Sequence, residues 1–202
     1  MYYSEKHTLE RIKQLPDFQE RWNGQIPENY WILGIRSADD QPNTFDDKFE
    51  LWKGETRLFD FTGTTNPGTV VLEGGFARYN KDGAAVLLAD AIHDDCWIKD
   101  IHNGKVVGLC SRRGRTKAMR HTRDGNRDNK TDQTGKVYTG WHGLNFHPDQ
   151  MHIKFDARPD DRGIGWYSAG CQVPNQLEPY KKTIELVGDQ LISYVLLNEF
   201  SV

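Results

Sequence analysis

The chain has 202 residues, a length that suits one domain with at most a short appendage. Its 6 Trp, 8 Tyr and 9 Phe supply bulky surface for a core, which excludes a disordered chain, and its 19 Gly and 8 Pro predict many turns. The formal net charge of −3 gives no positive field for nucleic acid, and no apolar run approaches the roughly 18 residues of a membrane span.

The spacing of apolar residues predicts a β-rich chain with a helix near each end. A helix is predicted over residues 7–22, which Pro16 kinks or divides, and another over residues 177–191 with Asn175 as its N-cap. Strands are predicted at residues 30–36, 49–54, 57–62, 69–72, 84–88, 97–101, 105–109, 152–155 and 192–200, with turns at 53–56 and 102–104. The fold class is therefore α+β, mainly β, with an N-terminal helical extension (residues 1–29) and a main domain (residues 30–202).

Two charged segments follow each other in the middle of the chain. For the basic cluster between Arg112 and Arg123 we predict a solvated face, with a phosphate contact as the alternative. Residues 124–132 space side-chain oxygens as a calcium loop does, but Asn129 stands where such a loop has its glycine. This favours a polar turn network, with a weak cation site as the alternative.

Cys171 is the candidate nucleophile. It follows the small-residue turn Ser168-Ala169-Gly170, which permits a tight bend and lets backbone N–H groups approach a substrate carbonyl. His147, 24 residues earlier, can return on a neighbouring strand as the base that forms the thiolate. The alternative is that Cys171 is a small buried hydrophobe, which is the common state of a lone cysteine.

Ser168-Ala169-Gly170-Cys171 resembles the nucleophile motif of L,D-transpeptidase catalytic domains, where a His and a spacer precede Ser/Thr-His-Gly-Cys. The resemblance implies a β-sandwich or barrel in which Cys171 attacks a peptidoglycan stem-peptide carbonyl and His147 is the base. It also implies that Gly170 belongs to the oxyanion turn and that Ser168 braces this turn. A wider similarity, over residues 30–197, is to uncharacterised bacterial and phage proteins with a Ser-Ala-Gly-Cys-Gln-Val motif.

The residues around the motif depart from the transpeptidase pattern. Ala169 stands where transpeptidases have a second His, and Gln172 with Val173 replaces an apolar–Arg pair, so donor and acceptor specificity stays open. His142 is the rival base and is otherwise structural. The residues predicted to line the substrate site are Trp141, His142, Asn145, Trp166, Tyr167, Ala169 and Gln172, and the aromatic ones are alternatively core residues.

The expected function is cysteine-dependent acyl transfer or hydrolysis on peptidoglycan stem peptides, without a cofactor or metal. The absence of a secretory signal predicts synthesis in the cytoplasm and delivery to the wall by lysis, injection or a virion, as for a phage lysis or tail enzyme or an effector. Two alternatives stay open. One is a zinc-dependent peptidase with His142, His147, His152 and Cys171 as ligands, and the other is a non-catalytic cell-wall-binding or virion structural module.

Overall fold

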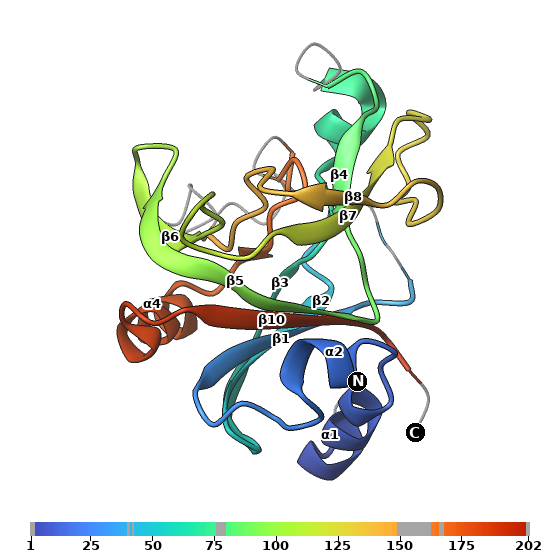
Figure 1. Cartoon of the computed structure of the whole chain (residues 1–202). Helices are drawn as coiled ribbons and strands as arrows, with labels where there is room; N and C mark the ends of the chain where they lie inside the picture. The colour runs from blue at the N-terminus through green and yellow to red at the C-terminus, as the bar shows by residue number, and fades with distance from the viewer. Residues whose placement is uncertain are drawn as a thin grey trace.

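The computed structural model describes residues 3–39, 41, 43–75, 80–148, 163–165 and 168–200. A curled seven-stranded sheet with few helices dominates it, which confirms the expected α+β, mainly β fold class (Figure 1). The strand order is β6-β5-β10-β1-β2-β3-β9, and a second sheet has the order β4-β7-β8. The strands are β1 (Tyr30–Arg36), β2 (Asp47–Lys53), β3 (Thr56–Thr64), β4 (Ala84–Leu87), β5 (Ala91–His102), β6 (Val106–Cys110), β7 (Met119–Asp124), β8 (Tyr138–Gly140), β9 (Val173–Pro174) and β10 (Ile192–Asn198).

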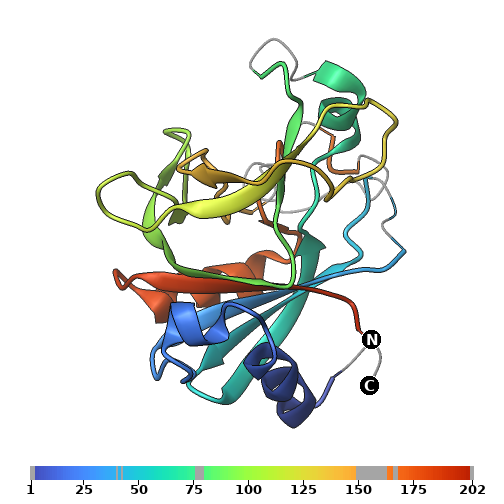
Figure 2. The same ribbon diagram turned by 45° about the vertical axis from the view of Figure 1, so that its right-hand side comes forward.

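β1 and β10 form a parallel pair at the centre of the large sheet. Along β1, Trp31 and Leu33 pack with the N-terminal helices α1 (Glu5–Lys13) and α2 (Phe18–Trp22), whereas Ile32 belongs to the cluster on the other face. Because successive side chains of a strand point to opposite faces, both faces of the sheet are covered. Figure 2 shows the two blue helices on one side of the sheet and the three-stranded sheet on the other.

The predicted N-terminal helix is present but divided at Pro16, whose ring cannot continue a helix. Ser4 caps α1, because its hydroxyl oxygen accepts the N–H of His7 at 3.2 Å. At the end of α2, Trp22 meets Trp31 edge to face with ring centroids 5.5 Å apart. The N-terminal segment therefore shares an apolar cluster with the sheet.

Most predicted strands are confirmed within a few residues, and the two predicted turns join β2 to β3 and β5 to β6. The predicted strand at residues 69–72 is wrong, because Val71–Gly75 forms a π-helical turn. The N–H groups of Val71 and Leu72 both donate to the carbonyl of Gly68, and both side chains pack with Ala84. Two successive side chains can share one side of a helical turn but not of a strand.

Three strands were missed for a compositional reason. β7 and β8 consist mainly of polar residues, and β9 has only two residues, so none of them shows an apolar alternation. The predicted strand at residues 152–155 lies outside the described residues.

The C-terminal helix α4 spans Leu177–Val187, and β10 follows it as predicted, but the N-cap is Gln176 instead of Asn175. Asn175 is engaged elsewhere, since its side-chain oxygen accepts from the hydroxyl of Thr62 at 2.6 Å and its N–H donates to the Thr62 carbonyl at 3.2 Å. The segment before α4 is thereby attached to β3. None of the helices in the described ranges has the length and apolar character of a membrane span.

The basic cluster is solvated only in part, since Arg113, Arg115 and Lys117 are exposed whereas the other arginines are partly buried and His121 is buried. Arg112 pairs with Asp100 of β5 at 2.8 Å, and Arg120 of β7 pairs with Asp17 at the start of α2. Arg115 shares Asp100 with Arg112, and Lys117 pairs with Asp94, so the acidic partners come from β5 and from the start of α2. The Arg120 pair also connects the three-stranded sheet to the N-terminal helices.

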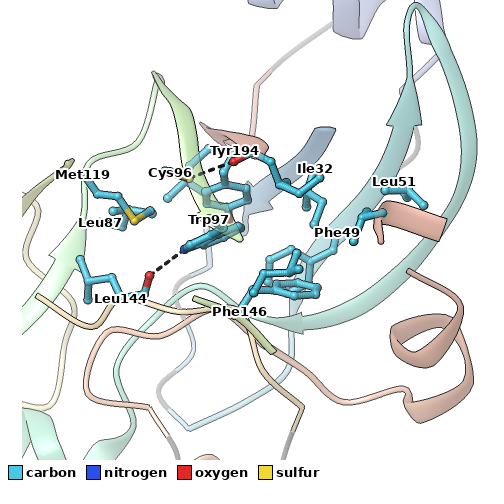
Figure 3. Packing of buried hydrophobic residues seen from close by; sticks show 14 of the residues in the cluster. Ile32, Phe49, Leu51, Leu87, Cys96, Trp97, Met119, Leu144, Phe146 and Tyr194 are labelled. Atoms are coloured by element: carbon cyan, nitrogen blue, oxygen red, sulfur yellow. Dashed lines mark hydrogen bonds between the residues drawn. The ribbon is translucent and has the colours of Figure 1, made fainter. Parts of the chain in front are cut away.

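The larger apolar cluster is centred on Trp97 of β5 (Figure 3). The indole N–H of Trp97 donates to the carbonyl of Leu144 at 2.8 Å. Two residues further on, Phe146 packs edge to face against Phe49 of β2, with ring centroids 5.4 Å apart. The segment from residue 144 to residue 147 is therefore held from its core side.

A buried hydroxyl connects β10 to the segment before β9. Tyr194 donates to the side-chain oxygen of Gln172 at 2.7 Å, and the Gln172 amide nitrogen donates to the carbonyls of Thr65 (3.3 Å) and Gly170 (3.2 Å). A Cβ at Gly34 of β1 would collide with the Tyr194 hydroxyl, so a glycine at this position makes room for the bond. These bonds hold the Gln172 side chain inside the core.

Tyr194→Phe is expected to lower the free energy of unfolding by about 1–3 kcal/mol, because it leaves the buried oxygen of Gln172 without a donor. Urea unfolding compares it with the wild type. The matched control is Tyr30→Phe, at the half-buried start of the central strand β1, where we expect a change within about 0.5 kcal/mol. Equal stability of Tyr194→Phe and the wild type would contradict the assigned role of the hydroxyl.

Candidate thiol site

The turn before Cys171 is closed by Ser168. The Ser168 hydroxyl accepts the N–H of Gly170 at 3.1 Å and donates to the carbonyl of Cys171 at 2.8 Å. Gly170 has a φ of 124°, and a Cβ there would collide with the carbonyl oxygen of Ala85, so only glycine fits. The bend that the small residues predicted is therefore built by one hydroxyl and one glycine.

Cys171 and His147 lie on neighbouring extended segments. Phe146 bridges Gln172 in parallel and Leu109 of β6 in antiparallel orientation. The N–H of His147 donates to the carbonyl of Gln172 at 3.2 Å. Phe146 and Gln172 point into the core, and since side chains alternate, Asn145, His147 and Cys171 belong to the opposite face. The register thus brings the predicted nucleophile and base to one face, two positions apart along the strands.

The thiol of Cys171 is 8% exposed, and it donates to the carbonyl of Gly143 at 3.3 Å. Burial raises the pKa of this thiol to about 11, against the opposing effect of the Asn145 backbone N–H. At neutral pH the side chain is therefore a protonated thiol. Its hydrogen points to Gly143 in this structure, so attack on a substrate requires that this hydrogen bond break.

The His147 imidazole is held by its neighbour and by a second histidine. Its Nδ1–H donates to the carbonyl of Pro148 at 3.0 Å, so in the neutral ring Nε2 carries the lone pair. The ring of His102, from the end of β5, stacks on it with centroids 4.0 Å apart and an interplanar angle of 16°. Burial, followed by the charge of His147, lowers the pKa of His102 to about 3.

The sequence reasoning placed His102 only in a hairpin turn and missed it as a member of this cluster. Asn145, which was predicted to line the site, connects Ser111, just after β6, to His102 at the end of β5. Its side-chain oxygen accepts the N–H of Ser111 and its amide nitrogen donates to His102, both at 2.9 Å. No short motif signals this contact, because His102 lies 43 residues before Asn145 and reaches it through the pairing of β5 with β6.

The remaining predicted lining residues are dispersed. Gln172 is fully buried, with its side chain bonded as described above, and the half-buried Ala169 packs with the cluster around Val71. Trp141 is exposed, and its indole N–H donates to the carbonyl of Thr116 at 2.9 Å. The predicted residues Trp166 and Tyr167 lie outside the described residues. A ligand contact for each of these side chains stays a prediction.

His142, the rival base, belongs to a second pair of histidines. Its ring lies 4.6 Å from that of His121 on β7, and burial lowers the pKa of both side chains, that of His121 to about 4. The carbonyl that receives the Cys171 hydrogen bond belongs to Gly143, the next residue after His142. His142 therefore adjoins the residue that binds the thiol, while its own ring is paired with His121.

The structure bears on both cation sites that the sequence suggested, the zinc set and the loop at residues 124–132. Within the described ranges, no three His, Cys, Asp or Glu side chains converge as a metal site, and His152 of the zinc set lies outside those ranges. In the loop from 124 to 132, a side-chain oxygen of Asp124 accepts the N–H of Asp132, and one of Asn126 accepts the N–H of Asp128. The loop is thus the polar turn network that its sequence favoured.

Comparison with family models, with curated proteins and with solved structures finds no match to this chain.

Alkylation of the folded protein with iodoacetamide is expected to modify Cys171 slowly at pH 7, at least about 300-fold more slowly than a free cysteine, because a pKa of about 11 leaves little thiolate. The rate should rise about tenfold per pH unit between pH 7 and 9. Peptide mass spectrometry measures it, with the fully buried Cys110 as the internal control. A rate that levels off near neutral pH would show an ion-paired thiolate at rest instead.

Stability is expected to fall between pH 7 and pH 5. The unfolded chain returns His121 to its ordinary pKa of about 6.5 and takes up a proton that the folded state, with a pKa of about 4, excludes. This residue alone should cost about 2 kcal/mol over that range. Urea unfolding of the wild type and of His121→Gln at both pH values measures the difference. Equal losses in the two proteins would contradict the assignment.

Proposed function

We propose that this protein performs thiol-dependent acyl transfer or hydrolysis on a peptide amide, with Cys171 as the nucleophile and His147 as the base. The observation that supports this most directly is the bridge between Phe146 and Gln172, which puts both side chains on one face of adjacent segments. The tight turn at Gly170 and the free thiol that follows it fit the same chemistry.

The proposed reaction begins when His147 takes the thiol proton on Nε2 while Nδ1–H stays bonded to Pro148. The thiolate attacks the carbonyl carbon and forms the C–S bond. As the C–N bond breaks, the imidazolium returns its proton to the leaving amine, and a thioester remains. Attack by water then completes hydrolysis, and attack by a second amine completes transpeptidation. Either step regenerates the thiol.

The oxyanion formed in this reaction needs backbone donors. The N–H of Gly170 is bonded to the Ser168 hydroxyl, so in this proposal the N–H of Cys171 is the first donor. The Gly170 N–H joins it if the hydroxyl turns away. Ser168 would then control how open the oxyanion site is.

For the substrate we propose peptidoglycan stem peptides, and for the fold an L,D-transpeptidase-like β-sandwich or barrel. The support is the resemblance of Ser168-Ala169-Gly170-Cys171 to the transpeptidase motif, together with the curled, mainly β architecture. A phage lysis or tail enzyme, or a delivered effector, is the setting that we propose for this activity.

A second candidate is a non-catalytic wall-binding or virion module. The observation in its favour is the burial of Cys171, since an 8% exposed thiol with a raised pKa is also what a core cysteine looks like. The zinc-dependent peptidase has no such support, because three of its four ligands, His142, His147 and Cys171, are among the described residues and do not converge as a metal site there.

Mass spectrometry of muropeptides after incubation with purified protein separates these candidates. We expect the wild type to cleave or exchange stem peptides, and Cys171→Ala to lose at least about a thousandfold in rate, because the nucleophile is gone. Cys110→Ala is the matched control, a buried cysteine on the neighbouring strand that should keep the activity. EDTA should have no effect.

Other outcomes point to the other candidates. Equal activity of the wild type and Cys171→Ala would exclude the thiol mechanism. Loss of activity on chelation, restored by zinc, would favour the metallopeptidase. Sedimentation of an inactive wild type with purified cell walls would favour the binding module.

A further inference from the structure

His102 and His147 stack on each other although they come from segments that lie on either side of β6. His102 ends β5, His147 follows the segment that bridges β6, and Gly108 of β6 lies between them. A Cβ on Gly108 would lie 3.5 Å from the Cβ of His147, 3.6 Å from that of His102 and only 2.8 Å from the Phe146 carbonyl oxygen. The missing side chain is what allows two imidazoles from non-adjacent segments to meet face to face.

The Asn145 amide determines which nitrogen of His102 carries the proton. Its oxygen accepts the backbone N–H of Ser111, so its nitrogen faces Nδ1 of His102 and donates to it. Both ring nitrogens of His102 face an amide nitrogen, since Nε2 lies 2.9 Å from that of Asn103. A neutral ring has a single acceptor nitrogen, so with Nδ1 accepting from Asn145 the proton is on Nε2, and the Asn103 amide has to turn its oxygen toward it. The ring is thus fixed in orientation and in tautomer, and it offers His147 a flat, uncharged surface.

We propose that His102 is a positioning residue of the thiol site: its ring, held by the Asn145 amide, fixes the plane of the His147 imidazole so that Nε2 of His147 takes the proton of Cys171. This inference rests on the proposed function. A neutral ring under His147 serves this role in two ways. It restricts rotation of the imidazole, and it does not repel the imidazolium that forms when the thiol is deprotonated.

The charged and titratable groups around the stack come from three elements. β5 contributes His102 and Asp100, the end of β6 contributes Cys110 and Arg112, and the segment before β9 contributes Cys171. The Asp100 carboxylate is paired with the Arg112 guanidinium at 2.8 Å. A positive charge on His147 therefore acts directly on His102, because it disfavours protonation of the His102 ring.

The test compares His102→Leu with His102→Phe. Both variants fill the space and both remove the Asn145 hydrogen bond, but only phenylalanine keeps a flat aromatic ring under His147. Nitrogen-15 NMR of the histidine rings reports the tautomer and pKa of His147 without any need for turnover. We expect a single Nε2-basic tautomer in the wild type and in His102→Phe, and a mixture of tautomers in His102→Leu. Asn103→Ala is the control that leaves the stack and the Asn145 bond in place.

If the wild type turns over peptidoglycan, kcat should fall about tenfold or more in His102→Leu, with KM unchanged, and stay within about threefold in His102→Phe. Identical His147 spectra in both variants and in the wild type would overturn the positioning role, and so would equal losses in the two variants. An inactive wild type with the expected His147 spectra would instead refute the proposed function and leave the positioning of His147 by His102 intact.

Discussion

The buried hydrogen bond between Tyr194 and Gln172 is the constraint from which the surroundings of Cys171 follow. The tyrosine hydroxyl reaches Gln172 through space left by Gly34, and the glutamine amide in turn holds the carbonyls of Thr65 and Gly170. Its partners have no access to water, so each broken bond leaves an unsatisfied polar group in the core. Because Gln172 points inward, Cys171 before it and His147 on the adjacent segment belong to the opposite face, where the thiol is bonded to the carbonyl of Gly143.

Asn145 contacts both the segment that carries Cys171 and the ring of His102. Its backbone N–H opposes the rise in the Cys171 pKa, its carbonyl accepts the N–H of Gln172 at 2.8 Å, and its side chain binds His102. One residue therefore sets the distance between the two segments and the orientation of the histidine stack. The result is a site that holds a protonated thiol and a neutral His102 imidazole at rest, so activation has to accompany substrate binding.

The sequence located the centre of the candidate site but not its composition. Cys171, Ser168 and Gly170 stand in a tight turn as their small side chains indicated, and His147 returns on an adjacent segment. Gln172 looked like a lining residue, yet it is fully buried, because strand alternation inside a short motif cannot be assigned before the register is known. His102 was missed for the same reason, since only the β5–β6 hairpin brings it to Asn145.

By itself the sequence determined the elements with a clear period: the helix divided at Pro16, the central strand Tyr30–Arg36, the hairpins around it and the C-terminal helix and strand. Local rules decide these features, because apolar spacing and turn residues act over a few positions. Only the tertiary structure decided that the residues at 71 and 72 turn as a helix, that the basic cluster separates into ion pairs, and that His102 stacks on His147. Those outcomes depend on partners far away along the chain, and a linear pattern does not record which segments will pair.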